Sequence, residues 1–514
     1  MKEQLKDKFL YIPVFLLSAY LLFRLADTSA LINNFPLDFA NDLSAHLARL
    51  HFLSEYGYHN LVPNWYNGFG YILFQTYPPG YYFAALPLYK LLNNVQLTTY
   101  ISLILIYILG FLAIYFIFKK DMPSKIKRIA FFLFFFVNPV SIGYLLRLGK
   151  LPELTGWLLN IIIFGIIVYY KDKPLDKKFL LFIPAYASLL LSNVSSFIVM
   201  SPLILGFVLM KKNKERVYAA LSALAALIIT SFWWISFYTN SLKNSLNNEA
   251  IYTKWLTENA PNSFFTFTTD KVTAMLSSLI LIILFYLYWK SKDKSRNELI
   301  LFSPIVLTAF LIFITPFTSA ITFIPIVNRP PVDTFTIGFL LIAIYFFLKI
   351  EYTKKQQVVL KYVLPMLIIL SIALSLIMTS TYPILKDIDR ETISLLPYIE
   401  GNFIVLENNK DKYGTSYSRG YYSFAPVYYN ANTISGWEDQ VLKEDDAKEI
   451  NDFLGCYKKN VIQCKNDPLT TQQIVEKAKY LNVNSIIMYD EDCDKMKALL
   501  NPVKETENVC LFQI

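Results

Sequence analysis

The stretch Leu97-Thr-Thr-Tyr-Ile-Ser-Leu-Ile-Leu-Ile-Tyr-Ile-Leu-Gly-Phe-Leu-Ala-Ile-Tyr-Phe-Ile-Phe118 contains no charged residue, and Lys119 and Lys120 follow it directly. As an α-helix it would be roughly 33 Å long, which matches the ~30 Å of hydrocarbon in a bilayer. An uncharged run of this length that ends at basic residues predicts a helix that crosses a membrane.

The whole chain has the composition of a membrane protein with several spans. Of its 514 residues, 55% are hydrophobic, 16% are aromatic and only 17% are charged, whereas soluble domains carry about 25% charged residues. We therefore predict an α-helical polytopic membrane protein. Eleven apolar runs are candidate spans, near residues 9–27, 97–118, 129–146, 152–170, 178–193, 195–210, 217–238, 273–290, 298–315, 334–350 and 358–379.

Charged residues are distributed unevenly along the chain. Residues 1–380 carry 33 Lys and Arg against 18 Asp and Glu, and residues 381–514 carry 15 against 21. Basic clusters in short loops favour the cytoplasmic side of a membrane, so they indicate orientation here and not nucleic-acid binding. The six clusters are Lys2–Lys8, Lys119–Arg128, Lys171–Lys178, Lys211–Arg216, Lys290–Arg296 and Lys349–Lys361.

One further apolar stretch, residues 71–92, is interrupted by Pro78, Pro79 and Pro87. If this stretch does not cross the membrane, all six basic clusters lie on the cytoplasmic side. If it does cross, every cluster after the first lies outside, against the positive-inside rule. We therefore expect a re-entrant or interfacial segment.

This reading divides the chain into a transmembrane bundle, residues 1–380, and an extracytoplasmic tail, residues 381–514. Lysines before the first run, with no small-residue cleavage site after it, predict an uncleaved anchor and a cytoplasmic N-terminus. The odd number of spans then places the tail outside, on the same face as the loops 28–96, 239–272 and 316–333. Strand-like runs at 402–406, 485–489 and 509–513, with a helical pattern at 470–481, predict a small α/β domain in the tail.

All four cysteines of the chain lie in the tail: Cys456, Cys464, Cys493 and Cys510. An even number in an extracytoplasmic segment predicts two disulfides, and three connectivities are open. We prefer the pairing of nearest neighbours, Cys456 with Cys464 and Cys493 with Cys510. Four reduced thiols are the alternative. The tail contains no histidine, which argues against a zinc site.

The first outer loop holds the most informative polar pattern. The three histidines of the chain, His46, His51 and His59, fall within fourteen residues there. On a helix, Asp38, Asp42, His46 and Arg49 would share one face. Such a helix could direct carboxylate, imidazole and guanidinium groups toward one point. The alternative is an amphipathic helix at the membrane surface whose polar groups are merely solvated.

Other outer residues are candidates for binding phosphate. Arg147 and Lys150 lie in a predicted tight outer turn that ends at Glu153, and they depart from the positive-inside trend. Arg329 is a further isolated outer cation. Lys254, Glu258 and the segment Trp437-Glu-Asp439 are weaker candidates.

Three motifs in this order resemble a known family. They are Asp42-x-x-x-His46-Leu-x-Arg49, then Tyr77-Pro-Pro-x-Tyr81-Tyr, then Arg147-x-Gly149-x-Leu-Pro-Glu153. The chain resembles the membrane proteins called 6-pyruvoyl-tetrahydropterin synthase-related, which belong to the GT-C glycosyltransferase superfamily. The first motif is also similar to the first-loop motif of oligosaccharyltransferase catalytic subunits. The tail's Gly436-Trp-Glu-Asp439 lacks the second Trp and the Tyr of their peptide-binding motif.

The resemblance implies a sugar transferase that works on the outer face of the cell membrane. Its partners would be a polyprenyl-phosphate sugar donor, a glycan, lipid or protein acceptor, and membrane lipids, with no nucleic acid. Asp42 matches the family's catalytic carboxylate, with Asp38 second and His46 beside them; Tyr77, Tyr81 and Glu153 are further site candidates. Arg147, Lys150, Arg329 and Arg49 would bind the donor phosphate. A divalent metal, Mg²⁺ or Mn²⁺, held by Asp42, Asp38 or His46 is compatible with this chemistry but not required by it.

Two other functions remain open at the level of sequence. A transporter or flippase for lipid-linked saccharides would also need many spans and outer cations, and Asn193 with its neighbouring serines could break a helix in the membrane. A non-catalytic scaffold would use the tail to recruit partners. If Asp42, His46, Arg147 and Glu153 meet at one outer cavity, the enzyme is favoured.

Overall fold

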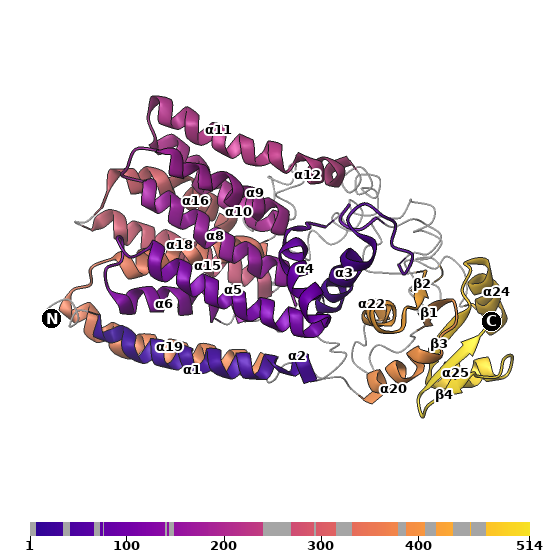
Figure 1. The fold of residues 1–514 in the computed structure, drawn as a ribbon. Helices are drawn as coiled ribbons and strands as arrows, with labels where there is room; N and C mark the ends of the chain where they lie inside the picture. Colours follow the sequence, from indigo (N-terminus) through magenta and orange to yellow (C-terminus); the bar gives the residue numbers. More distant parts are fainter. Residues whose placement is uncertain are drawn as a thin grey trace.

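The computed structural model describes residues 7–33, 42–65, 72–75, 77–138, 141–142, 149–239, 269–291, 294–314, 332–378, 387–406, 418–434, 453 and 469–514. The chain folds into a bundle of apolar helices that is followed by a small domain containing a sheet (Figure 1). The N-terminus lies at one end of the molecule and the small domain at the other.

Each of the eleven predicted spans contains a helix. The bundle helices are η1 (Lys8–Leu10), α1 (Tyr11–Thr28), α2 (Ala30–Asn33), α5 (Val95–Ile117), α6 (Lys125–Phe136), α8 (Leu151–Tyr170), η2 (Lys177–Leu181), α9 (Phe182–Ser192), α10 (Val194–Met210), α11 (Asn213–Ile229), α12 (Ser231–Phe237), α15 (Thr269–Lys290), α16 (Arg296–Ile314), α18 (Val332–Lys349) and α19 (Lys354–Met378). The segment between α1 and α5 adds α3 (Leu43–Tyr56) and α4 (Gly80–Leu92). At thirteen residues, α4 is shorter than the roughly 17–25 residues of a membrane crossing.

Five helices in the described part of the chain are long and apolar enough to cross a membrane. They are Lys8–Ile32, Val95–Ile117, Leu151–Tyr170, Arg296–Phe313 and Lys354–Ile377. A sixth would be α11 with α12, which are bent by 67° at Thr230. The Thr230 hydroxyl donates to the carbonyl of Ala226 at 2.8 Å, a back-bond that bends helices. Of the other predicted spans, α6 and α9 are helices of twelve and eleven residues, and α10 and the searched parts of α15 and α18 are apolar helices of 10–17 residues.

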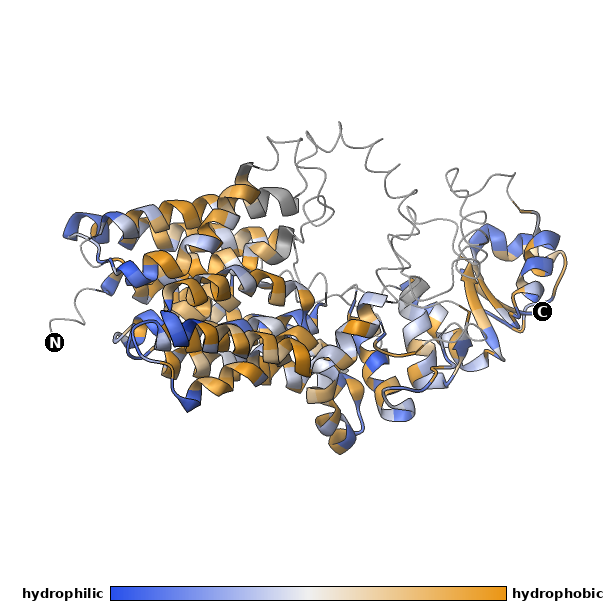
Figure 2. Cartoon of the chain, turned by 90° about the horizontal axis from the view of Figure 1, so that it is seen from above, coloured by the Kyte–Doolittle hydropathy of each residue, from blue (hydrophilic) through white to orange (hydrophobic). Residues whose placement is uncertain are grey.

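Apolar side chains cover the outside of the bundle as well as its interior. Large side chains such as Phe15 and Ile377 are 72% and 80% exposed, which suits a surface that contacts lipid. Hydrophilic loops gather at the end of the bundle where the N-terminus lies (Figure 2). Apart from the N-terminal cluster, the described parts of the basic clusters join consecutive helices at this end, opposite the small domain.

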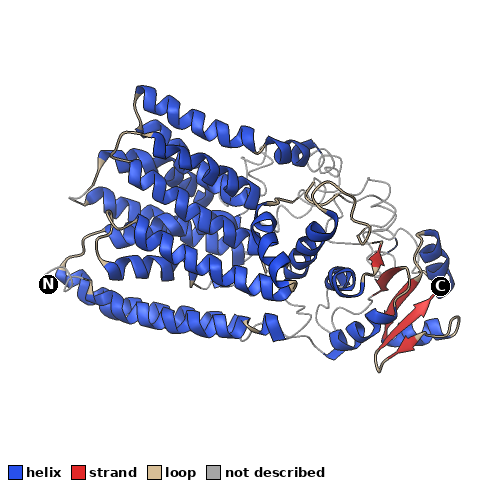
Figure 3. Ribbon diagram, viewed as in Figure 1, coloured by secondary structure: helices blue, strands red, loops and turns tan. Residues whose placement is uncertain are grey.

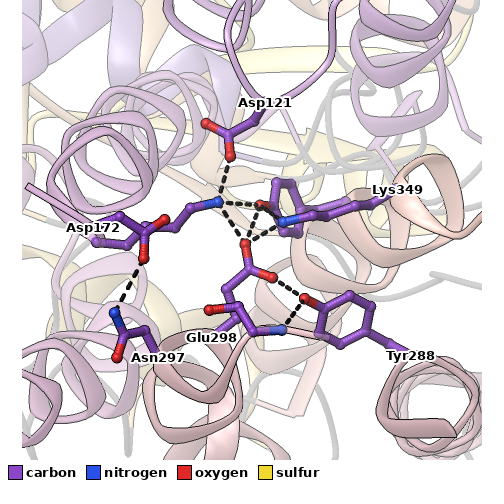
Figure 4. Close-up of polar contacts among 9 residues, drawn as sticks. Asp121, Asp172, Tyr288, Asn297, Glu298 and Lys349 are labelled. Atoms are coloured by element: carbon purple, nitrogen blue, oxygen red, sulfur yellow. Dashed lines mark hydrogen bonds and ion pairs between the residues drawn. The ribbon is translucent and has the colours of Figure 1, made fainter. Parts of the chain in front are cut away.

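That end of the bundle also contains a buried network of charges around Glu298 (Figure 4). The Glu298 side chain, in the first turn of α16, is fully buried and accepts from Lys171 at 2.5 Å, from Lys349, and from the Tyr288 hydroxyl. Lys171 also forms an ion pair with Asp121. The network therefore joins the α5–α6 loop, the end of α8, and α15, α16 and α18.

The small domain contains one five-stranded mixed sheet with the strand order β2-β1-β3-β5-β4 (Figure 3). Its strands are β1 (Asn402–Leu406), β2 (Asn432–Thr433), β3 (Ser485–Tyr489), β4 (Lys504–Glu505) and β5 (Val509–Gln513). β1 pairs in parallel with β2 and β3, and β5 pairs antiparallel with β3 and β4. The helices are α20 (Asp387–Leu395), α22 (Ser418–Tyr429), α24 (Thr471–Tyr480) and α25 (Asp490–Lys497), with the turn η6 (Leu396–Tyr398). The predicted strands at 402–406, 485–489 and 509–513 are confirmed.

A disulfide between Cys493 and Cys510 joins α25 to β5. This confirms one of the two predicted pairs. The other predicted pair, Cys456 with Cys464, lies outside the described residues.

Candidate functional site

The candidate site is built on α3, which lies between the bundle and the small domain (Figure 1). The helix begins after Asp42, whose backbone carbonyl accepts from the His46 amide at 3.1 Å, and it ends at Gly57, which adopts a φ of +76°. His46 and Arg49 are 2% and 3% exposed. Their side chains are therefore not solvated groups on a surface helix, since α4, α5 and α22 pack around α3.

His46, Arg49 and Tyr82 form a connected group of hydrogen bonds. The Tyr82 hydroxyl, on α4, lies 2.7 Å from His46 Nδ1, and Arg49 Nη1 lies 3.4 Å from the same nitrogen. Arg49 also donates to the Tyr82 hydroxyl. Because a guanidinium can only donate, Nδ1 is an acceptor and the imidazole proton resides on Nε2. Among the residues that the structure describes, none forms a hydrogen bond with His46 Nε2.

His46 is held in its neutral form by its surroundings. Burial lowers its pKa well below the usual value, and the positive charges of Arg49 and Lys150 lower it further. A neutral His46 with its proton on Nε2 presents a hydrogen-bond donor to the site, not a base.

Aromatic rings surround the guanidinium of Arg49. Its central carbon lies 4.2 Å from the centre of the Tyr77 ring and 6.0 Å from that of Trp65. Cation–π contacts of this kind hold a guanidinium in one orientation while leaving its charge available to an anion.

The start of α8 adds a second pair of charges. Lys150 directly precedes the helix, and its ammonium group lies 3.9 Å from a carboxylate oxygen of Glu153, whose side chain is almost fully buried. An acidic group in the first helical turn is favoured by the helix dipole. The positive charge of Lys150 also lowers the pKa of His46, so the start of α8 interacts electrostatically with α3.

Close backbone packing holds α4 against the end of α9. A side chain at Gly80 would lie 2.8 Å from the backbone of Leu191, at the end of α9. In the same way, a side chain at Gly156 of α8 would lie 2.7 Å from the Ser196 hydroxyl of α10. The turn between α9 and α10 is fixed by Asn193, whose side chain accepts from the Ser196 amide at 2.7 Å.

The structure brings together only part of the predicted site. His46, Arg49, Lys150, Glu153 and Tyr77 belong to it, and half-buried Asp42 lies one turn before His46. The predicted site residues Asp38, Arg147 and Arg329, and the weaker candidates Lys254, Glu258 and Trp437-Glu-Asp439, lie outside the described residues.

The clustering of the three histidines does not carry over to the structure. His51 interacts with the Tyr89 hydroxyl at 3.1 Å, and His59 packs against the ring of Tyr58. The Tyr81 hydroxyl lies beside Thr99 and Ser102 of α5.

Sequence reasoning missed Tyr82 and Trp65, which contact the site's polar groups most directly. Tyr82 is part of the quoted Tyr-Pro-Pro motif, and its position one residue after Tyr81 was the available signal. The partners of Trp65 come from distant segments, so no local pattern marks it.

The described residues do not provide a complete site for a metal ion. No group of three His, Cys, Asp or Glu side chains in the described ranges could hold one. We therefore derive no step that uses a metal.

Comparison with solved structures shows that the fold resembles that of an archaeal oligosaccharyltransferase. Two crystal structures of the oligosaccharyltransferase of Archaeoglobus fulgidus resemble it. The apo form gives a TM-score of 0.54 at 10% identity over 92% of this chain and 69% of that chain. The complex with Zn and sulfate gives 0.52 at 11% identity over 91% of this chain and 68% of that chain.

A further structure, the archaeal oligosaccharyltransferase AglB from Archaeoglobus fulgidus in complex with an inhibitory peptide and a dolichol-phosphate, gives 0.49 at 11% identity over 93% of this chain and 70% of that chain. No protein-family model matches the chain, and no curated protein sequence matches it significantly. The likeness concerns the fold alone, so the GT-C superfamily and the narrower pterin synthase-related family both stay predictions.

Proposed function

We propose that the chain is a membrane glycosyltransferase that transfers a sugar from a polyprenyl-phosphate-linked donor to an acceptor on the outer face of the membrane. The observation that carries the proposal is the fold, which resembles an oligosaccharyltransferase over nine-tenths of the chain. The arrangement of charged groups at the end of the bundle near the small domain supports it.

The position of the site suits a lipid-linked donor. A polyprenyl chain stays in the bilayer, so its phosphate must be bound at the depth of the headgroups. The helix α3, which carries Arg49, lies between the bundle and the small domain (Figure 1). The charges of Arg49 and Lys150, which both act on His46, would stabilise the phosphate as it departs from the sugar. Arg147 and Arg329 are proposed as further phosphate ligands.

Asp42 is the proposed catalytic carboxylate. Asp42 lies one helical turn before His46, so it is close to the hydrogen-bond donors His46 and Arg49. It is half-buried, so an acceptor can still reach its carboxylate. Transfer to a hydroxyl or amide acceptor requires a group that removes a proton as the new bond forms, and a carboxylate can do this. Asp38 is the second candidate, and the acceptor is a glycan, a lipid or a protein.

We further propose that the N-terminus is cytoplasmic and the small domain extracytoplasmic. The basic loops at the end of the bundle opposite the small domain support this orientation. The disulfide in the small domain also supports it, because disulfides persist in oxidising compartments.

The test is sugar transfer by the purified full chain in liposomes, with a radiolabelled polyprenyl-phosphate sugar. Asp42→Asn should lower the rate by about 10²–10⁴. Asp172→Asn, an exposed carboxylate at the opposite end of the bundle, is the matched control and should leave the rate unchanged. Arg49→Ala should chiefly raise the apparent KM, because it removes a ligand that already binds the donor in the ground state.

Two outcomes would contradict the proposal. Full transfer by Asp42→Asn would remove Asp42 from the reaction and pass its role first to Asp38 and then to Glu153. Movement of labelled donor across the vesicle membrane without any new glycosidic product would instead support a flippase.

A further inference from the structure

Two consecutive residues, Asn64 and Trp65, fasten the first outer loop to the small domain. The backbone carbonyl of Asn64 accepts from the backbone amide of Thr433 at 3.0 Å. The side-chain amide of Asn64 donates to the side chain of Asn432 at 3.0 Å. The indole Nε1 of fully buried Trp65 donates to the backbone carbonyl of Tyr422, in α22, at 2.8 Å.

On the side of the small domain, this connection leads directly to the sheet. The Tyr422 hydroxyl accepts from the amide of Val405, in β1, at 3.0 Å. Its ring packs against Phe403 of the same strand, with ring centres 5.5 Å apart. The residue whose carbonyl binds Trp65 is therefore connected directly to the sheet.

On the side of the site, Trp65 leads to Arg49. Its ring packs edge to face on Phe52 of α3, with centres 5.0 Å apart, and the Arg49 guanidinium lies 6.0 Å from the indole. Arg49 in turn donates to His46 and Tyr82. A continuous series of contacts thus runs from β1 through α22 and Trp65 to the buried guanidinium.

We propose that Trp65 is a positioning residue through which the small domain fixes the Arg49 guanidinium at the site. The proposal rests on the function proposed above, in which Arg49 binds the donor phosphate. Trp65 acts only through Arg49 and does not contact the donor. Loosening the hydrogen bond between Trp65 and Tyr422 consequently weakens donor binding without changing the chemical step.

The test is Trp65→Phe in the full chain, which keeps an aromatic ring but removes the indole N–H. Trp234→Phe is the matched control, since Trp234 Nε1 donates to the carbonyl of Leu227 at the same distance of 2.8 Å, within α11 and α12. Trp65→Phe should raise the apparent KM for the polyprenyl-phosphate sugar roughly three- to tenfold, as expected for one lost hydrogen bond, with kcat nearly unchanged. Trp234→Phe should change neither.

A double-mutant comparison separates positioning from a general loss of stability. In an Arg49→Ala background, Trp65→Phe should have no further effect on the KM, because the residue through which it acts is absent. Additive effects of the two substitutions would overturn the proposal, and so would equal effects of Trp65→Phe and Trp234→Phe.

Hydrogen exchange of the full chain tests the connection without any transfer assay. Trp65→Phe should speed exchange at the amides of α3, compared with the wild type and with Trp234→Phe. If Trp65→Phe does not fold, Asn432→Ala loosens the same connection from the small domain and should act in the same direction. Unchanged exchange in α3 would overturn this inference even in an active enzyme. A wild type that transfers no sugar would refute the proposed function but leave the exchange result decisive.

Discussion

Replacement of Glu298 by glutamine should destabilise the bundle strongly. The Glu298 side chain is fully buried and accepts from two lysines and from the Tyr288 hydroxyl. It lies in the first turn of α16, and Lys349 lies in the last turn of α18, so both charges are also favoured by helix dipoles. The carboxylates of Glu298 and Asp121 balance the charges of Lys171 and Lys349 (Figure 4).

The loss in the free energy of unfolding follows from the unbalanced charges that Glu298→Gln leaves behind. Glu298→Gln keeps the shape of the side chain but leaves two lysines with one carboxylate, Asp121, which forms its ion pair with Lys171. Lys349 is 19% exposed and is left without the carboxylate it contacts. Removing one partner of a buried ion pair costs about 3–5 kcal/mol. We expect the free energy of unfolding to fall by about this amount.

The assay is reversible unfolding of the full chain in mixed micelles, followed by circular dichroism. Asp172→Asn is the matched control: Asp172 is adjacent to Lys171 but exposed, with one hydrogen bond from Asn297 at 3.1 Å, and it should cost less than about 1 kcal/mol. The double variant Glu298→Gln with Lys349→Met should recover part of the loss, because it restores neutrality. Equal, small losses for Glu298→Gln and Asp172→Asn would refute the view that the charges act as a buried, balanced network.

The bundle could be predicted from sequence because hydrophobic runs are a local property. Every predicted span contains a helix, since an uncharged run near 20 residues has few alternatives to a helix in lipid. The number of helices that cross the membrane could not be predicted from hydrophobic runs alone. The predicted span 217–238 is bent at Thr230 by a side chain that bonds its own backbone, and α6 has only twelve residues. Both features depend on what packs around the helix.

From helical spacing, only the site residues that share one helix could be placed together. Asp42, His46 and Arg49 were expected together because helical spacing places them on one face, and the described helix contains the last two. Sequence spacing could not show that Tyr82 would form a hydrogen bond with His46. It also could not show that Trp65 would connect Arg49 to the small domain. These contacts join segments from 36 to 357 positions apart, so they arise from tertiary packing alone.

Three further predictions concern His46, the disulfide and the junction of the small domain. His46→Asn retains an acceptor near Nδ1 but loses the outward N–H, so it should transfer sugar more slowly than His46→Gln, whose longer amide can replace that donor; equal rates in the transfer assay would refute the donor role. In intact cells, a membrane-impermeant thiol reagent should label Cys493 and Cys510 only after reduction, and labelling that needs lysis would contradict the proposed orientation. Glu391, in α20, accepts from the side chains of Thr506 and Asn508 at 2.7 and 2.9 Å, which ties α20 to the β4–β5 hairpin. Burial raises the pKa of Glu391, but these hydrogen bonds outweigh it and lower the pKa below its usual value. A carboxyl whose pKa is lower in the folded state stabilises that state above its unfolded pKa of about 4.3, and this contribution is lost as the pH falls through the folded pKa. Hydrogen exchange of the full chain should therefore show β4 and β5 losing protection first as the pH falls below about 4, after correction for the intrinsic pH dependence of exchange, and Glu391→Gln should remove that dependence. An unaltered acid response in Glu391→Gln would show that another group controls the junction.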